Sequence, residues 1–293
     1  MDPGVTQMFI RNLLSQQSGI LPASFEFRAV GGGSINDTFI ITCDRQQAFF
    51  CKINWAKKFP YLFIKEKNGL ELLAKQKIFR IPAVIAVEEN EDRQVIILEY
   101  IQQGLRTKKF WQLFGKQLAA LHLVSNDCFG LDEDNYMGAS AQINTLSENW
   151  MDFFVHKRLE PQIKLAADHN LLEGKHIRQF QKLYQFLHEI FPEEKPSLLH
   201  GDLWSGNFLC DENSSPVLID PAVYYGNRHI DLAMTGLFGG FDYGFYEAYD
   251  YYSPLPQNHR QIWDICNLYP LLIHLNLFGS GYLSEILQTI NKY

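Results

Sequence analysis

The spacing of hydrophobic positions along the chain changes near residue 100. Before that point, short apolar runs rich in β-branched and aromatic residues alternate with polar or glycine-rich segments, which is typical of strands. One longer segment has apolar residues at helical spacing. We therefore expect a β-rich region with a single helix: strands over 25–31, 37–43, 47–53 and 94–99, a further strand that begins at 81–83, and the helix over about 61–77.

After residue 100, apolar residues recur at the i, i+3, i+4 spacing of amphipathic helices. Phe110, Phe114, Leu118 and Leu121 fall on one side of the first such helix. The same texture predicts helices at 150–167, 176–190 and from 245 onward, with a short β-rich insert at 208–210 and 217–219.

These two hydrophobic patterns, strand-like before residue 100 and helical after it, predict an α+β chain with two lobes. We expect a small β-rich N-lobe over 1–101, a linker over 102–104, and a larger, mainly helical C-lobe over 105–293. A cleft between two such lobes is a usual place for a ligand.

Composition narrows the class of protein. The chain has 293 residues, of which 46% are hydrophobic and 14% aromatic, enough for a large core, so a disordered or fibrous protein is excluded. The most apolar stretch, 269–278, is interrupted by His274 and Asn276, and we expect no membrane span. The five cysteines form no C-x-x-C pair and the N-terminus has no signal-peptide pattern, so we expect a reduced, cytoplasmic protein.

The net charge of −7 argues against a nucleic-acid partner. Residues 1–104 carry 12 Lys or Arg and 11 Asp or Glu, whereas the remaining residues carry 14 and 22. The acidity of the C-terminal part would favour a cationic or amine-bearing small ligand, although a solvated acidic surface explains it as well.

The densest group of polar residues is HGDLWSGN at 200–207, followed by Asp220 at the end of a short apolar run. Asp202, Asn207 and Asp220 have the D-x-x-x-x-N…D spacing typical of phosphotransferases. There one carboxylate accepts the proton of an attacking hydroxyl, while an amide oxygen and a second carboxylate hold Mg²⁺. Two alternatives stay open: a turn stabilised by Asp and Asn, and a transition-metal site of His200 and Asp202.

The expected N-lobe contains two features that would complement this loop. The segment GGGSIN at 31–36 lies between two strands, where the backbone of Gly32, Gly33 and Ser34 could approach phosphate oxygens, although a hairpin with positive φ would also use glycines. Lys52 lies inside an apolar strand, where its ammonium needs a partner, and Glu66 on the next helix is the natural candidate. On an edge strand, Lys52 could instead extend into solvent.

The end of the expected strand at 94–99 is a candidate hinge. Backbone groups of Glu99 and Ile101 could bond the edge of an adenine, although an ordinary strand end would look the same. The candidate features thus follow one another in the order found in a nucleotide-dependent phosphotransferase: glycine loop, strand lysine, helix glutamate, hinge, catalytic loop and strand-end aspartate.

Several segments resemble the fructosamine kinase (ketosamine 3-kinase) family. They are LLHGDLWSGNFL at 198–209, VLIDPAVYYGNRHIDLAMTGLFGGF at 217–241 and LYPLLIHLNLFGSGY at 268–282, joined by FFCKIN at 49–54 and FGLDEDNYMGASAQIN at 129–144. The family is related to aminoglycoside phosphotransferases and choline kinases. The resemblance therefore implies a bilobal, protein-kinase-like fold.

The resemblance also implies a role for each matching residue. Asp202 would be the catalytic base or would orient the substrate hydroxyl. Asn207 and Asp220 would hold Mg²⁺, Lys52 would contact the ATP phosphates, and Glu66 would pair with Lys52.

Four further residues have implied roles with simpler alternatives. His200 would position the loop, and Asp231 would brace it by accepting backbone N–H bonds, unless Asp231 only caps the next helix. Trp204 would form an apolar wall against the sugar and His274 would contact the substrate, with plain core packing as the alternative for both.

The activity implied by the resemblance is ATP- and Mg²⁺-dependent phosphorylation of the 3-hydroxyl of a ketosamine. The substrate would be a fructosamine, ribulosamine or erythrulosamine adduct of a small amine or of a protein lysine, and the role would be deglycation. An aminoglycoside or choline-type phosphotransferase remains an alternative, as does a catalytically silent nucleotide-binding scaffold. The sequence does not indicate the oligomeric state or the preferred ketosamine.

Overall fold

The computed structural model describes residues 3–18, 24–31, 35–43 and 47–293, which form two compact units. Unit 1 consists of Met1–Leu105 and Leu209–Asp220, and unit 2 of Arg106–Phe208 and Pro221–Tyr293. The insertion of Leu209–Asp220 into unit 1 has a direct cause in main-chain pairing. The N–H of Gly104 donates to the carbonyl of Cys210 (2.9 Å), and Arg80 pairs with Val217 in a parallel bridge.

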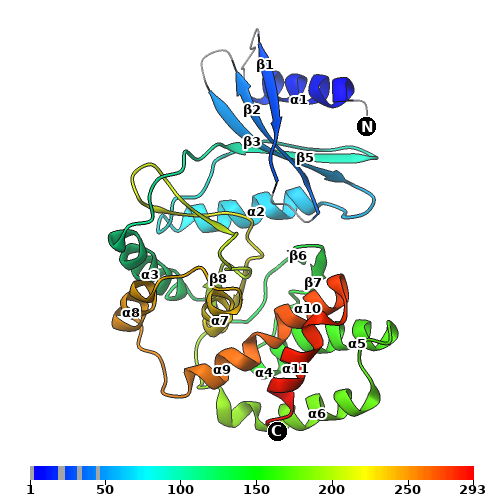
Figure 1. Cartoon of the computed structure of the whole chain (residues 1–293), viewed down its shortest axis with the longest axis vertical. Coiled ribbons are helices and arrows are strands. Elements are labelled where there is room, and N and C mark those ends of the chain that lie inside the picture. The colour runs from blue at the N-terminus through cyan, green and yellow to red at the C-terminus, as the bar shows by residue number, and fades with distance from the viewer. Residues whose placement is uncertain (1–2, 19–23, 32–34, 44–46) are drawn as a thin grey trace. The chain divides into compact units, whose positions relative to one another are not determined.

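Unit 1 is built on a five-stranded antiparallel sheet (Figure 1). The strand order is β1-β2-β3-β5-β4, so β3 lies in the middle of the sheet. The strands are β1 (Phe25–Ala29), β2 (Asp37–Cys43), β3 (Ala48–Trp55), β4 (Val84–Glu89) and β5 (Arg93–Glu99). All five correspond to strands predicted from the apolar runs, with small shifts at their ends.

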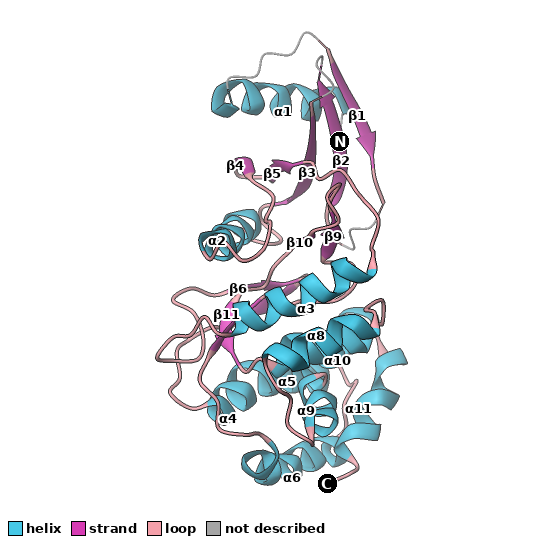
Figure 2. Cartoon of the chain, turned by 90° about the vertical axis from the view of Figure 1, so that its left-hand side faces the viewer, coloured by secondary structure: helices cyan, strands magenta, loops and turns pink. Residues whose placement is uncertain are grey.

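Two helices cover opposite faces of this sheet, α1 (Pro3–Ser18) and α2 (Leu62–Lys75) (Figures 1 and 2). Ile10, Leu13 and Leu14 of α1 pack against one face. The expectation of a single helix in this region was wrong. The apolar stripe of α1 is short, and the helix is stabilised by packing on the sheet rather than by a strong pattern of its own.

A short hairpin completes unit 1, apart from its first residue, Phe208, which belongs to unit 2. It consists of β9 (Phe208–Cys210) and β10 (Pro216–Leu218), and its second strand leads directly to Asp220. The β-rich insert predicted from the sequence coincides with these strands to within two residues.

Unit 2 is mainly helical and, with unit 1, confirms the α+β class. Its strands are short: β6 (Asn135–Met137), β7 (Ser140–Gln142), β8 (Ser197–Leu199) and β11 (Tyr224–Gly226). Its helices are α3 (Lys108–His122), α4 (Trp150–Phe153), α5 (Glu160–Asp168), α6 (Gly174–Ile190), α7 (His229–Leu237), α8 (Tyr243–Tyr252), α9 (His259–Cys266), α10 (Leu268–Phe278) and α11 (Leu283–Ile290). A π-helical stretch, Phe154–Leu159, joins α4 to α5 within the helix predicted at 150–167.

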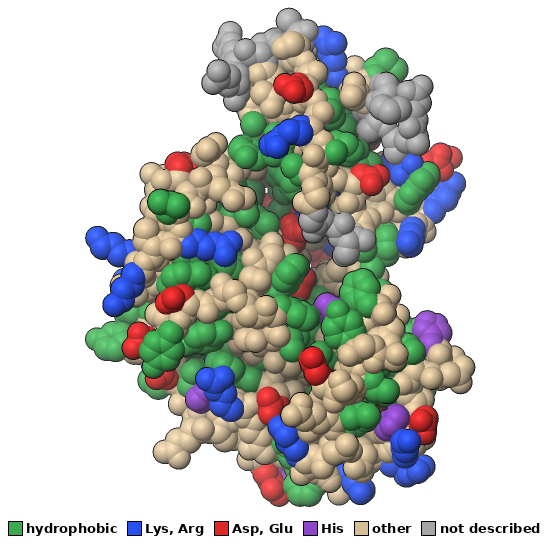
Figure 3. Space-filling model, in the orientation of Figure 1, with side chains coloured by type: hydrophobic (Ala, Val, Ile, Leu, Met, Phe, Trp, Pro, Cys, Tyr) green, Lys and Arg blue, Asp and Glu red, His purple; other side chains and the backbone are tan. Residues whose placement is uncertain are grey.

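Aromatic side chains make up much of the core of unit 2. The ring of Phe114 on α3 lies 5.0 Å from that of Phe208 and 5.2 Å from that of Phe245 on α8. Hydrophobic side chains also reach the surface over α3 and α8 (Figure 3), where Tyr251 and Tyr252 are exposed. Among the described residues, no helix combines the length and the apolar character that crossing a bilayer requires.

Candidate active site

Lys52 lies at the centre of the polar site in unit 1. Its side chain is only 3% exposed, and its Nζ lies 2.8 Å from Oε1 of Glu66 and 2.5 Å from Oδ1 of Asp220. Alternation along β3 turns Cys51 and Ile53 into the core with α1 and Lys52 to the opposite face, towards α2. The predicted pair of Lys52 with Glu66 is confirmed, and the alternative of a lysine on an edge strand is excluded because β3 lies between β2 and β5.

The two carboxylates keep the buried ammonium charged. Burial by itself would lower the pKa of Lys52, but the negative charges of Asp220 and Glu66 and their hydrogen bonds to Nζ outweigh it and raise the pKa above its usual value. Lys52 therefore presents a fixed positive charge over the whole physiological pH range.

The helix that carries Glu66 is held in place by a buried glutamine of the sheet. Gln94 on β5 accepts the N–H of Phe63 at Oε1 (3.1 Å) and donates from Nε2 to the carbonyl of Phe59 (2.6 Å). The helix α2 has no side-chain cap of its own, so the first bond satisfies an N–H of its first turn, and the second holds the chain just before the helix.

Asp220 ends the β10 segment in a sharp turn. Its φ is 53°, in the left-handed region that Asp enters more readily than most residues, and its side chain is 40% exposed. A carboxylate held at one oxygen by Lys52 and partly open to solvent has the chemistry of a ligand for a hard cation.

The loop at 200–207 belongs to unit 2. Asn207 donates from Nδ2 to both the carbonyl (2.8 Å) and the carboxylate Oδ2 (2.9 Å) of Asp202. These bonds use the amide nitrogen, so they leave the amide oxygen available as a hard ligand. The backbone N–H of Asp202 in turn donates to Nδ1 of the buried His200 (3.3 Å), so His200 supports the loop, as the resemblance implies.

Asp231 at the start of α7 braces the same loop. Its two carboxylate oxygens accept the N–H groups of His200 (2.8 Å) and Gly201 (2.9 Å), and its side chain is fully buried. The implied bracing role is confirmed, and the alternative is wrong because Arg228 occupies the N-cap position of α7.

A histidine that the sequence reasoning did not single out extends this bracing. Nε2 of the buried His122 lies 3.3 Å from Oδ2 of Asp231, and its Nδ1 lies 2.8 Å from the hydroxyl of Tyr249. Because a carboxylate only accepts, the contact assigns the proton to Nε2, and the Tyr249 hydroxyl donates to Nδ1. In the sequence, His122 is only a histidine on the apolar face of a predicted helix, and such a position does not by itself indicate a site.

Trp204 and His274, the two expected substrate residues, contact a common ring. The ring of Phe238 lies 6.1 Å from that of Trp204 and 5.0 Å from that of His274, which also contacts Phe278 and Tyr282. Hydrophobic side chains gather over α10 on the face drawn in Figure 3. Trp204 is 36% exposed, so it is not a core residue, and Nδ1 of His274 is used in a bond to the carbonyl of Pro270 (2.7 Å).

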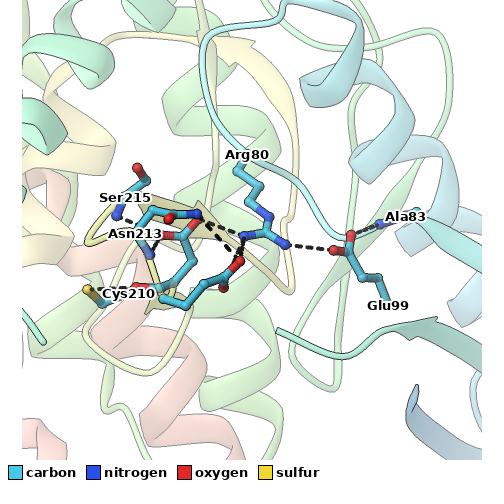
Figure 4. Close-up of polar contacts among 8 residues, drawn as sticks. Arg80, Ala83, Glu99, Cys210, Asn213 and Ser215 are labelled. Atoms are coloured by element: carbon cyan, nitrogen blue, oxygen red, sulfur yellow. Dashed lines mark hydrogen bonds and ion pairs between the residues drawn. The ribbon is translucent and has the colours of Figure 1, made fainter. Parts of the chain in front are cut away.

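The expected hinge lies at the end of β5. The Glu99 side chain bonds Nη2 of Arg80 (2.8 Å) and the N–H of Ala83 (3.2 Å), as Figure 4 shows, and Ile101 is buried. Gly32, Gly33 and Ser34 lie outside the described residues. The expected phosphate-binding loop therefore stays a prediction.

The structure thus brings the expected residues together in two groups. Lys52, Glu66 and Asp220 meet in unit 1, and Asp202, Asn207, His200 and Asp231 meet in unit 2. Within the described ranges, no three His, Cys, Asp or Glu side chains are grouped so that they could hold a metal ion.

The sequence model of the family described as "Fructosamine kinase" matches residues 6–293. The chain is 36% identical to a "Probable ketoamine kinase" of Synechocystis sp., over 97% of this chain and 95% of the relative. It is also 36% identical to the chloroplastic protein-ribulosamine 3-kinase of Arabidopsis thaliana, over 90% of this chain and 81% of the relative.

Solved structures agree with these matches. The crystal structure named "Putative fructosamine-3-kinase" from Haemophilus somnus 129PT has a TM-score of 0.86 at 28% identity, covering 97% of this chain and 96% of that one. A type I macrolide 2'-phosphotransferase has a TM-score of 0.57 at 16% identity, over 99% and 97% of the two chains, and shares the fold alone. Because the family model matches residues 6–293, nearly the whole chain, the chain belongs to the fructosamine kinase family.

Proposed function

We propose that this protein is an ATP-dependent kinase that phosphorylates the 3-hydroxyl of a ketosamine. The observation that carries the proposal is the buried Lys52, whose ammonium is held between Glu66 and Asp220. A charged lysine fixed by a helix glutamate is the part of a kinase that binds the phosphates of the nucleotide. Its presence counts against a silent scaffold.

In this proposal Lys52 contacts the phosphates of ATP and Glu66 fixes its direction. The backbone of Glu99 and Ile101 bonds the adenine, and the backbone of Gly32, Gly33 and Ser34 covers the phosphates. Because two carboxylates keep the Lys52 ammonium charged and fixed in position, little reorganisation is needed when phosphate charge develops.

Asn207 and Asp220 would hold Mg²⁺. Both offer hard oxygen atoms, the ligands that Mg²⁺ prefers, and Mg²⁺ keeps several waters, so two protein ligands suffice. The amide orientation of Asn207 fits this role because its nitrogen already bonds Asp202. When bound, Mg²⁺ supplies charge neutralisation on the phosphates.

Asp202 would receive the proton of the attacking hydroxyl. In the transfer, the 3-hydroxyl oxygen forms a bond to the γ-phosphorus of ATP, the bond from that phosphorus to the β-bridging oxygen breaks, and ADP leaves. The hydroxyl proton passes to the Asp202 carboxylate, which Asn207 keeps in one direction through the bond to Oδ2. Asp231 and His200 hold the loop from behind.

On the substrate side, Trp204 would lie against the sugar and His274 would contact the substrate. The exposed ring of Trp204 supports this role. We propose ribulosamine, erythrulosamine or fructosamine adducts, on small amines or on protein lysines, as substrates. The 3-phosphate product then breaks down and releases the amine, which makes the reaction a deglycation in the cytoplasm.

The test is a substrate panel with ADP release as the readout. The purified chain is assayed with ATP and Mg²⁺ on ribulose-, erythrulose- and fructose-derived lysines, with kanamycin and choline as competing substrate classes. We expect turnover of at least one ketosamine and of neither control. Turnover of kanamycin or choline alone would identify a different phosphotransferase, and ATP binding with no ADP release from any substrate would identify a silent protein.

The matched variants are Asp202→Asn and Asp168→Asn. We expect Asp202→Asn to lower kcat by about 10²–10⁴-fold while ATP still binds, because the loop keeps its shape but loses the proton acceptor. Asp168 lies at the exposed end of α5 and pairs with Lys164, so Asp168→Asn should keep wild-type turnover. Equal turnover in both variants would remove Asp202 from this role.

A further inference from the structure

Arg80 joins three separate segments of unit 1. It lies in the loop between α2 and β4, and Figure 4 shows its guanidinium between Glu99 on one side and the turn of the β9–β10 hairpin on the other. Nη2 donates to Oε1 of Glu99 (2.8 Å), and Nη1 donates to Oδ2 of Asp211 (2.7 Å). Both oxygens of Glu212 lie 3.3 Å from Nη1.

Each of the two closest carboxylates is also fixed by backbone. The second oxygen of Glu99 accepts the N–H of Ala83 (3.2 Å). Oδ1 of Asp211 accepts the N–H groups of Asn213 (2.9 Å) and Ser215 (2.8 Å), which closes the hairpin turn. Arg80 therefore links two groups that are each already rigid, so its planar fork sets the distance between them.

The three carboxylates around Arg80 mean that only a positively charged side chain can make this link. The Asp211 side chain is only 4% exposed. Burial would raise the pKa of Asp211, but hydrogen bonds from Arg80, Ser215 and Asn213 lower it below its usual value, so the carboxylate is charged. Without the guanidinium, Glu99, Asp211 and Glu212 would repel one another.

The main chain of Arg80 reaches the same hairpin. Its carbonyl accepts the N–H of Leu218 (3.2 Å), and it pairs with Val217. Leu218 is the last residue of β10 and lies two positions before Asp220, whose carboxylate bonds Lys52. Arg80 is thus bonded through its main chain to the strand that leads to Asp220, and through its side chain to Glu99 at the end of β5.

We propose that Arg80 is a positioning residue of the kinase, which holds the segment at 99–101 and the hairpin before Asp220 at a fixed separation. The proposal rests on the proposed function, in which the first segment bonds adenine and Asp220 holds Mg²⁺ on the phosphates. The two ends of one nucleotide would then depend on the same guanidinium, so its loss should weaken binding of ATP more than binding of the sugar.

The test compares Arg80→Met, Arg80→Lys and Lys57→Met with the wild type. Lys57→Met is the matched control because it removes one positive charge and one ion pair, with Asp92, from the exposed surface of the same unit. KM for ATP, KM for the ketosamine and kcat are measured for each, with unfolding curves to establish that each is folded. Isothermal titration of ATP–Mg²⁺ gives Kd directly.

We expect Arg80→Met to raise KM and Kd for ATP at least tenfold and to leave KM for the ketosamine within twofold. Arg80→Lys should fall between Arg80→Met and the wild type, because an ammonium cannot bond both sides as the fork does. Lys57→Met should match the wild type. A folded Arg80→Met with wild-type KM for ATP, or with both KM values raised equally, overturns the proposal.

If Arg80→Met does not fold, Glu99→Gln decides. It removes the charge on one side of the link and leaves a single amide oxygen for two donors, Arg80 and the N–H of Ala83. It keeps the backbone of the hinge and leaves Arg80 paired with Asp211. KM for ATP should therefore rise at least threefold with KM for the ketosamine unchanged; no change overturns the proposal. A wild type that binds ATP but phosphorylates no ketosamine overturns the proposed function alone. In that case the Kd comparison for ATP still tests Arg80.

Discussion

The bracing of the loop at 200–207 by Asp231 can be tested with the substitution Asp231→Asn, which changes one oxygen to an NH₂ group. In the wild type, one carboxylate oxygen accepts the N–H of His200 and the other that of Gly201. Whichever way the amide of the variant turns, its NH₂ group faces one of these donors. At least one buried N–H therefore loses its acceptor, and two do so if the NH₂ group replaces Oδ2, which also accepts from Nε2 of His122.

The magnitude follows from burial. A buried donor left without a partner costs about 1–3 kcal/mol, and the remaining bond loses its charge assistance, about 1 kcal/mol more. The variant no longer has to bury a carboxylate charge, which offsets part of this cost. These two costs sum to about 2–4 kcal/mol before the offset, so we expect a net loss of about 1–3 kcal/mol in the free energy of unfolding. We also expect a lower kcat because Asp202 follows Gly201 directly.

The assay is urea unfolding at neutral pH, read as a shift in midpoint at constant slope, with kcat measured well below the transition. Asp242→Asn is the control, because Asp242 is an exposed N-cap that accepts the N–H of Gly244 (2.8 Å) and Asn caps as well as Asp. It should change stability by no more than about 0.5 kcal/mol. An Asp231→Asn variant as stable and as active as this control would refute the reasoning.

Two further predictions concern stability. Gly201 has φ of 83°, and a Cβ at this position would overlap the carbonyl oxygen of Ala222, so Gly201→Ala should lower the free energy of unfolding in urea by about 3 kcal/mol or more. The control Gly236→Ala, in a helix with open space around it, should cost nothing. Equal effects of the two substitutions would contradict the strain at Gly201. Burial, followed by the neighbouring positive charges, lowers the pKa of His229 to about 3, and its Nδ1 accepts from Nε1 of Trp263 (3.1 Å). This pKa lies below that of the unfolded chain, about 6.5, so protonation favours unfolding, and stability should fall by up to about 1.4 kcal/mol per pH unit from pH 6.5 towards pH 4. The substitution His229→Gln should flatten this dependence of stability on pH. An unchanged dependence would show that His229 does not cause it.

The strands and the pairing of Lys52 were predictable from the sequence because they depend on local alternation. β2 has the predicted bounds, and an ammonium within the apolar run of β3 had to find a carboxylate. Glu66 on the next helix met this need. The bonds within the loop at 200–207 were indicated for a different reason, since its residue types and their spacing already marked it as a polar loop with a possible function.

Other parts of the molecule depend on which surfaces meet. α1 is helical because its few apolar residues meet the sheet. Arg158 lies in a run with two other basic residues, and nothing in that run indicates that it alone is fully buried, with its guanidinium 4.0 Å from the centre of the Tyr224 ring and 4.5 Å from that of Phe153. Long-range packing decides such cases, and no local pattern encodes it.

By itself, then, the sequence determined the strands, the main helices and the residue types of the loop at 200–207, because each follows from a short-range period or spacing. Tertiary structure alone decided that Leu209–Asp220 joins unit 1, that Asp220 bonds Lys52, and that Arg80 links Glu99 to Asp211. The partners in these contacts lie up to 168 positions apart along the chain. Which of many charged side chains become neighbours over such distances is set by the packing of whole elements.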